Sequence, residues 1–321
     1  MARVSPTALA AAVADRDVVG ISSDAPMRGL ANGLLKTLGT VVQNITNPVD
    51  LTAGLVSTQS SHLLNTLALT TTTNGLSLLN SNTGAGIGIA VLDSGLDQNA
   101  VSLDNVTYYD AVGGSVTRVN GRADGYGHGT HVAGLLASNG SSSSGLYRGV
   151  AMSARVIAVR VLDDNGQGRT SDVVNALNFV VANRESLGVR IVSMSLGHPI
   201  FEPASRDPLV TAVQRAVASG IVVVVSAGNY GGDPVTHATG YAGITSPGNA
   251  PGAITVGATE TFQTDDRRDD EVAWYSSRGP SWYDGFQKPD VVAPGSHLVS
   301  NISTTSTISS RLSRRHRARE R

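Results

Sequence analysis

The sequence lacks cysteine altogether, and aromatic residues make up only 4% of its 321 positions. The absence of cysteine excludes disulfides, thiolate zinc sites and cysteine nucleophiles. Because aromatics are scarce, any core has to be built from Val, Leu, Ile and Ala. Hydrophobic residues still reach 40%, which is enough for a sizeable core in one large domain or two modest ones. No apolar run reaches the length that a membrane-spanning helix needs.

Charge is unevenly distributed, although the formal net charge is only −1. Six Arg and one Glu lie in the last eleven residues, and the rest of the chain is mildly acidic. A basic tail is one way to contact nucleic acid or anionic lipid. Here no aromatic side chains alternate with the arginines, so we expect neither nucleic acid nor a membrane as a partner. At the other end, the apolar stretch Thr7–Ala14 stops at Asp15 and is too short for a convincing signal peptide.

Continuous apolar runs alternate with amphipathic segments from Gly86 onward. The runs are Ile87–Leu92, Val156–Leu162, Val189–Leu196, Ile221–Val225 and Ala253–Val256. Runs of this length suit strands that are buried on both faces of a parallel sheet. Helices are predicted after Ser171 and after Asp207, where Pro208 takes the first helical position and Gly220 ends the helix. The alternation predicts an α/β fold with a doubly wound, mainly parallel sheet.

Asp93 ends the first apolar run, and His128 begins a predicted helix between two glycines. In open α/β sheets, functional sites form beyond the carboxyl ends of the strands. A buried carboxylate there accepts the Nδ1 proton of a histidine, and the histidine acts as general base and then as general acid. Taken alone, Asp93 would more often make a turn with Gly95, and His128 would more often be a capping or core residue. Their occurrence together favours the catalytic interpretation.

A metal site is the alternative for this helix, because His128 and His131 lie three residues apart on one face. Zinc requires further ligands, and no nearby carboxylate or third histidine completes a set. We therefore expect no metal here.

Asn229 follows the apolar run Ile221–Val225 after three small residues. A side-chain amide held at such a strand end donates to a developing oxyanion, an effect of about 10²–10³ in rate. The alternative is an asparagine in an ordinary turn before Tyr230.

Six motifs follow one another in a single order between about Gly84 and Gly295. They are Val91–Gly95, His128–Gly134, Ser193–Gly197, Ser226–Asn229, Ser276–Pro280 and Lys288–Gly295. Together they resemble the subtilisin-like serine proteases, the subtilase family (peptidase S8). The resemblance implies a serine endopeptidase that hydrolyses peptide bonds with an Asp-His-Ser triad. It implies that Asp93 orients His128, that His128 is the base, that Asn229 is the oxyanion donor, and that His131 is structural.

The same resemblance makes Ser195, Leu196 and Gly197 the edge that binds substrate. An extended peptide would pair with this edge through main-chain hydrogen bonds, and the glycine leaves room for its backbone. An ordinary strand end is the alternative. The expected partner is thus a peptide or protein substrate, and we expect a monomer that is secreted, as family members are.

The nucleophile that the family requires is missing from its expected place. Relatives have a Gly-Thr-Ser-Met turn after the Lys288–Gly295 motif, due here at about residues 314–316, where Arg314, Arg315 and His316 stand. The nearby serines, from Ser303 to Ser313, lack the flanking glycine. We therefore expect a fold that is incomplete at the C-terminus and a chain that is inactive as given. The alternative is a non-catalytic peptide-binding pseudoprotease, and a nucleic-acid or membrane binder with a basic tail is a further one.

The resemblance also divides the chain. Residues 1–27 are expected to be a remnant of an inhibitory prodomain, weakly tied to the main domain because its own sheet partners are missing. Residues 28–83 form a linker that leads into the incomplete peptidase domain, residues 84–302. Residues 303–321 form a Ser/Thr-rich and then Arg-rich tail.

No cofactor is expected. Calcium is possible in the family, but no site is identifiable, because the segment Ser138–Gly145 lacks the carboxylates of a calcium loop. Asp163 and Asp164 are the remaining candidates for an ion, and a solvated turn with Gly166 is the preferred interpretation.

Overall fold

The computed structural model describes residues 24–29, 59–73, 76–79, 83–100, 102–121, 124–143, 145, 147–233, 235–303 and 306–308. The apolar stretch Thr7–Ala14 and the arginine-rich end of the chain lie outside these residues.

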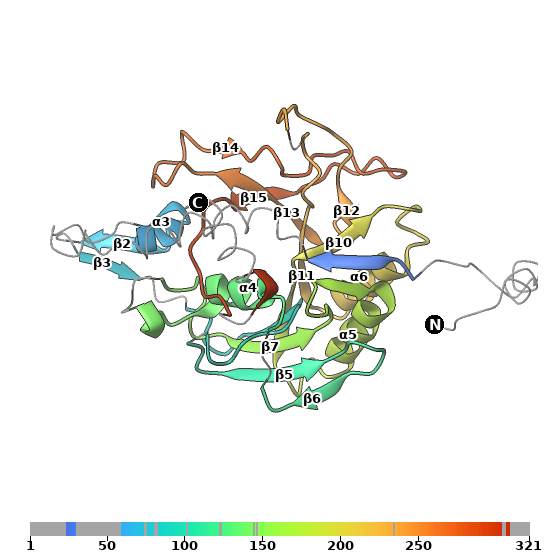
Figure 1. Ribbon diagram of the computed structural model, residues 1–321, viewed down its shortest axis with the longest axis horizontal. Helices are drawn as coiled ribbons and strands as arrows, with labels where there is room; N and C mark the ends of the chain where they lie inside the picture. The colour runs from blue at the N-terminus through green and yellow to red at the C-terminus, as the bar shows by residue number, and fades with distance from the viewer. Residues whose placement is uncertain are drawn as a thin grey trace, which may run out of the picture.

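A nine-stranded sheet forms the centre of the molecule, in the order β14-β13-β11-β9-β4-β7-β5-β6, with β15 also paired to β13 (Figure 1). Its middle consists of parallel strands: β4 (Gly88–Asp93), β7 (Arg155–Arg160), β9 (Val189–Met194), β11 (Val222–Ser226) and β13 (Ile254–Glu260). The strands β5 (Val106–Asp110) and β15 (Val291–Pro294) extend the parallel part. The short strands β6 (Thr117–Val119) and β14 (Glu271–Val272) are antiparallel edges. Each of the five apolar runs is thus a strand, with ends shifted by up to four residues.

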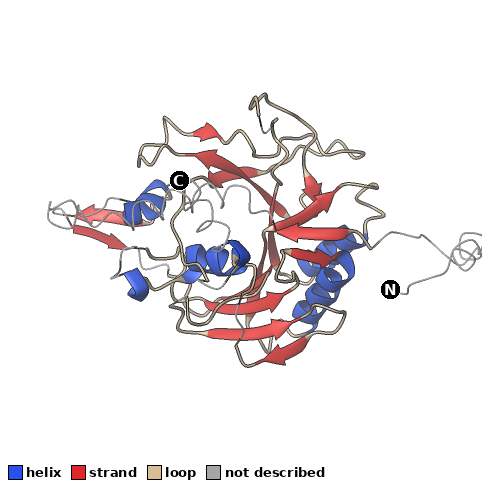
Figure 2. Cartoon of the chain, in the orientation of Figure 1, coloured by secondary structure: helices blue, strands red, loops and turns tan. Residues whose placement is uncertain are grey.

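Alternate residues of β4 belong to two different cores. Ala90 and Leu92 lie in one buried cluster, and Ile89 and Val91 lie in the other. Side chains of a strand point to opposite faces in turn, so both faces of the sheet must be covered. Figure 2 shows helices on both sides of the sheet.

The helices α5 (Thr170–Ala182) and α6 (Pro208–Ala218) contribute to the larger cluster, and α4 (His128–Ala137) contributes to the smaller one. Among the described residues, no helix is long and apolar enough to cross a membrane. The predicted doubly wound, mainly parallel α/β fold is confirmed.

The two predicted helix starts differ in outcome. Asp207 caps α6 as predicted, because its Oδ1 accepts hydrogen bonds from the main-chain N–H groups of Leu209 (2.8 Å) and Val210 (3.3 Å). Ser171 does not cap α5, which already begins at Thr170. Instead, Ser171 donates from its main chain (2.8 Å) and from its hydroxyl (2.7 Å) to the carboxylate of Asp24. A residue 147 positions earlier in the chain thus supplies the cap, a pairing that local sequence does not encode.

A second sheet lies beside the first, in the order β12-β10-β1-β8. It contains β12 (Thr245–Ser246), β10 (Leu196–Pro199), β1 (Pro26–Gly29) and β8 (Gln167–Arg169). In Figure 1 the blue strand β1 lies against β10. Pro26 and Met27 pair with β8, and Asp24 and Ala25 accept hydrogen bonds from the start of α5, so for residues 24–27 the expectation of a weakly tied segment is wrong. The strand also runs across the expected boundary between residues 27 and 28.

The remaining elements lie at the periphery. Helix α3 (Gln59–Thr66) precedes the hairpin of β2 (Thr70–Thr73) and β3 (Leu76–Leu79), and a 3-10 turn, η2, spans Ser141–Ser143. Asn65 of α3 donates to the Asp265 carboxylate at 2.9 Å, which fastens this unit to the loop after β13.

The two faces of β11 provide a test of this architecture. Val223 is 1% exposed and Val222 is 46% exposed. We expect Val223→Ala to lower the free energy of unfolding by about 2 kcal/mol, because two buried methyl groups are lost and a cavity remains. The matched variant Val222→Ala should lower it by less than about 0.5 kcal/mol. Urea unfolding measures both, and equal losses at the two positions would contradict the assignment of faces.

Candidate active site

Asp93 and His128 form a buried pair at the carboxyl edge of the central sheet. Asp93 is the last residue of β4 and is 1% exposed, and His128 is the first residue of α4 and is 4% exposed. The Nδ1 atom of His128 lies 2.7 Å from Oδ1 of Asp93. With Nδ1–H donating to the carboxylate, Nε2 is left as the basic nitrogen. The main-chain N–H of Ser94 donates to the same Oδ1 at 2.7 Å, which helps to fix the carboxylate.

Two glycines allow the helix to begin against the turn that follows Asp93. Gly127 has a φ of 98°, a conformation that favours glycine, and it turns the chain into α4. A β-carbon on Gly129 would lie only 2.1 Å from the carbonyl oxygen of Gly95, so no larger residue fits there. The close contact brings the start of α4 to the end of β4, and the His128 ring to Asp93.

His131 lies one turn further along α4 and is 6% exposed. Its pKa is lowered from 6.5 to about 3, first by burial and then by the neighbouring His128. Burial disfavours the charged imidazolium, so the ring stays neutral in the folded protein. Within the described part of the chain, no group of three or more His, Asp or Glu side chains is placed to hold a metal ion.

The edge formed by Ser195, Leu196 and Gly197 lies beside an extended segment of the same chain. β1 pairs antiparallel with β10, with Arg28 opposite Gly197 and Gly29 opposite Leu196. Its other edge pairs with β8, with Met27 opposite Gly168. The space between β10 and β8, here termed the groove, is filled by the extended strand β1. Met27 is fully buried in this groove, while Arg28 is exposed.

The groove leads directly to the buried pair. The main-chain N–H of Gly29 donates to the carbonyl of Gly166 at 3.1 Å. A β-carbon built on Gly29 would lie 3.6 Å from Nδ1 of His128. An extended chain in this groove thus passes against the imidazole ring.

Asn229 lies three residues beyond β11, at the same edge of the sheet. β11 and β4 both pair in parallel with β9, so their carboxyl ends point the same way and Asn229, Ser195 and Asp93 share one edge. The loop around Asn229 is held by the fully buried Ser277. Ser277 donates its main-chain N–H to the carbonyl of Gly228 at 3.0 Å, and its hydroxyl accepts from the N–H of Tyr230 at 3.0 Å. The Ser276–Pro280 motif was noted in the sequence, but nothing there indicated this role.

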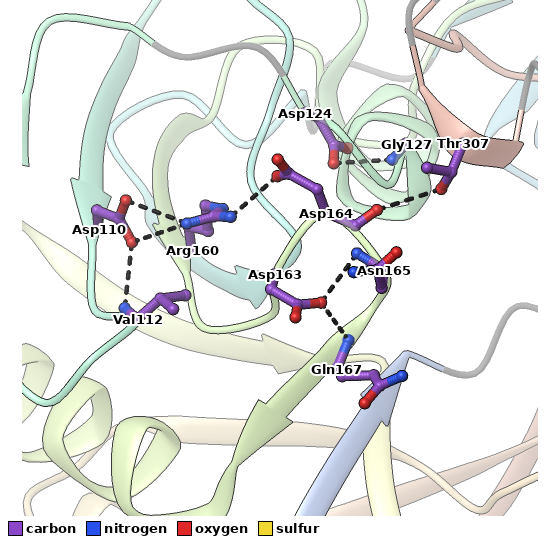
Figure 3. Close-up of polar contacts among 10 residues, drawn as sticks. All are labelled: Asp110, Val112, Asp124, Gly127, Arg160, Asp163, Asp164, Asn165, Gln167 and Thr307. Carbon is purple, nitrogen blue, oxygen red and sulfur yellow. Dashed lines mark hydrogen bonds and ion pairs between the residues drawn. The ribbon is translucent and has the colours of Figure 1, made fainter.

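A tight turn beside the groove contains the two acidic residues that were considered for an ion (Figure 3). Oδ1 of Asp163 accepts from the main-chain N–H groups of Asn165 and Gln167, both at 2.9 Å, and Gly166 closes the turn. Asp164 forms an ion pair with Arg160 at 2.9 Å. Both carboxylates therefore have structural partners, and the turn sets the course of β8.

The last described segment of the chain packs close to His128. Thr307 donates its main-chain N–H to the carbonyl of Gly125 at 2.8 Å, and its hydroxyl donates to the carbonyl of Asp164 at 3.3 Å (Figure 3). Ser303 and Ser306 are fully buried. The positions at which the nucleophile is expected, residues 314–316, lie outside the described residues.

The chain is similar to known proteins in sequence and in structure. A model of the Subtilase family matches residues 84–320. The serine protease AprX of Bacillus subtilis (strain 168) is 40% identical over 234 residues, which are 70% of this chain and 50% of AprX. Subtilisin E of the same organism is 36% identical over 223 residues, 68% of this chain and 49% of its own length. The solved structure of sphericase superposes with a TM-score of 0.59 at 33% identity, covering 77% of this chain and 81% of sphericase.

The chain therefore belongs to the subtilase family, and these relatives are serine proteases of the subtilisin type. It spans about half the length of the first of these curated relatives.

The low pKa of His131 predicts how stability depends on pH. The unfolded state binds a proton at this side chain below about pH 6.5, and the folded state does so only below about pH 3. The contribution of neutral His131 to stability is therefore fully present above pH 6.5. It is lost as the pH falls towards 3, by about 1.4 kcal/mol per pH unit. We expect His131→Gln to remove this part of the slope in urea unfolding measured at pH 7.5, 6 and 5. A variant that keeps the wild-type slope would show that His131 titrates normally in the folded protein.

Proposed function

We propose that this chain comes from a subtilisin-type serine endopeptidase and that Asp93, His128 and Asn229 are its acid, base and oxyanion donor. One observation supports this most directly. The buried contact of 2.7 Å between Asp93 and His128 lies at the end of a groove that holds an extended polypeptide strand. A site that binds extended chain beside a general base suits hydrolysis of the peptide backbone.

In this proposal, a substrate strand takes the place of β1 and pairs with Ser195–Gly197 on one side and with β8 on the other. Main-chain hydrogen bonds give affinity that does not depend on side chains. His128 removes the proton from a serine hydroxyl as that oxygen attacks the substrate carbonyl, and it then protonates the leaving amine. Asp93 keeps the Nδ1–H tautomer and stabilises the imidazolium. The amide of Asn229 donates to the oxyanion that forms.

Nucleophilic attack is the step that this chain is not expected to perform. Arg314, Arg315 and His316 occupy the positions where the family pattern requires Gly-Thr-Ser-Met. We propose that the chain as given lacks the catalytic serine and is inactive. Residual water-mediated hydrolysis by an incomplete triad reaches about 10³–10⁴ over water in favourable cases.

The peptide-binding pseudoprotease is the second candidate. It is favoured by the groove itself, since β10 and β8 hold a strand through hydrogen bonds that involve no serine. In both proposals the partner is a peptide or protein. The segment 24–29 then acts as the inhibitory end of a prodomain, which agrees with the anchoring of Asp24 on α5. Secretion remains a prediction by resemblance, and one matching relative is named a major intracellular serine protease.

The anchoring of β1 can be tested on the chain as it stands. Met27 is fully buried and its neighbour Arg28 is exposed. A charge at residue 27 would lose its water without gaining a partner. We therefore expect Met27→Asp to release β1 and to speed amide exchange at Gly29 and Thr170 by at least about tenfold, while Arg28→Asp leaves both rates near those of wild type. Unchanged exchange in Met27→Asp would contradict the occupied groove.

Activity is tested with a serine-directed fluorophosphonate probe. We expect no labelling of this chain and full labelling of an active subtilisin treated in parallel. Stoichiometric labelling of any serine would show that the chain has a nucleophile that the motif comparison missed. The converse experiment places a Gly-Thr-Ser-Met turn at about residues 314–316 and adds the helix that follows it. That chain should label, and His128→Ala should abolish the labelling. A folded chain of this kind that never labels would refute the protease proposal and leave the pseudoprotease.

A further inference from the structure

The helix that carries His128 begins without a capping side chain of its own. The N-cap residue of α4 is Gly127, and no side chain at that position accepts a hydrogen bond. The first main-chain N–H groups of any helix lack partners within the helix and require acceptors from elsewhere. In α4 the main-chain N–H groups that require such acceptors lie on both sides of His128.

Asp124 supplies the missing acceptor from the loop before the helix. Its Oδ1 accepts from the main-chain N–H of Gly127 at 2.8 Å, a contact drawn in Figure 3. Its Oδ2 accepts from the main-chain N–H of Thr130 at 2.9 Å and from the Thr130 hydroxyl at 2.8 Å. Both residues are fully buried. One carboxylate thus binds the chain on both sides of His128.

The same assembly is connected to the loop that carries Asp93. The hydroxyl of Thr130 accepts from the main-chain N–H of Asp97 at 3.0 Å. The hydroxyl of Ser94 accepts from the main-chain N–H of Gly129 at 2.9 Å. The start of α4 and the turn after β4 are therefore joined at two points, in addition to the contact between the acid and the base themselves.

We propose that Asp124, acting through Thr130, is a positioning residue that sets the imidazole of His128 against Asp93. The inference rests on the proposed function, in which His128 is the general base. Catalytic geometry tolerates errors of about 0.5 Å, and groups that act together are held by the hydrogen bonds of the residues behind them. Among the described residues, the hydrogen bonds of Asp124 and Thr130 go to the loop of Asp97 and to α4 and not to β1, so we expect their effect on a substrate to pass through His128.

The test observes the His128 ring directly and needs no turnover. The proton that Nδ1 shares with the Asp93 carboxylate resonates at low field in proton NMR, and its position reports the length of that hydrogen bond. Thr130→Val removes the hydroxyl that joins Asp124 to Asp97 and leaves every charge in place. We expect the low-field signal of the variant to shift upfield and to broaden through faster exchange with water. Thr130→Ser keeps the hydroxyl and should keep the wild-type signal.

A second pair of variants separates positioning from helix capping in general. Asp207 also holds a helix start with a buried carboxylate, although from the N-cap position of α6 itself, and its Oδ2 accepts from the hydroxyl of Ser246. Asp124→Asn and Asp207→Asn should both lower the unfolding midpoint. Only Asp124→Asn should move the low-field signal, and it gives the decisive result if Thr130→Val does not fold.

The outcomes distinguish this inference from the function on which it rests. If folded Thr130→Val gives the same low-field signal as wild type, the positioning role is overturned and the proposed function stays intact. If Thr130→Val does not fold, an unchanged signal in Asp124→Asn has the same meaning. Absence of the low-field signal in wild type would mean that the Asp93–His128 hydrogen bond does not exist in solution, and both would fall together.

Discussion

Burial of the central strands on both faces is the constraint on which the rest of the structure depends. β4 has no polar face, because Ile89 and Val91 enter one core while Ala90 and Leu92 enter the other. Helices must then cover both sides of the sheet, and the chain has to cross the sheet from the end of one strand to the start of the next. Parallel strands direct their carboxyl ends to a single edge. Asp93, Ser195 and Asn229 meet at that edge because of this arrangement.

The second sheet lies beside the edge of the central sheet at which Asp93 and His128 meet. β10 follows β9 after a single residue, so the edge that pairs with β1 begins where a core strand ends. β8 provides the opposite wall, and its course is set by the turn in which Asp163 accepts from Asn165 and Gln167. A strand held between these walls is paired on both sides. The contacts that hold it are main-chain pairings, which do not depend on the side chains of the strand.

Most contacts that the sequence predicted join residues that are close together in the chain, and most that it missed join distant residues. The cap of α6 was predictable because Asp207 and the N–H groups that it accepts from are within three residues. The start of α5 was misplaced because its capping carboxylate, Asp24, is far away in the chain. Ser277, which holds the loop around Asn229, was missed because its partner Tyr230 is 47 positions away. Asp124 was missed for another reason: its partners Gly127 and Thr130 are close in the chain, but it lies before the N-cap residue, where the usual capping pattern does not apply.

By itself, the sequence determined the strands, the order of the motifs and the residue types at the site. These depend on local apolar runs and on side chains at strand and helix ends, which are properties of neighbouring residues. Only the tertiary structure decided which groups touch: the ring of His128 and the carboxylate of Asp93, β1 and the groove, Thr130 and the loop of Asp97. Each of these contacts joins residues more than 30 positions apart, and their distances are set by how the two cores pack around the sheet.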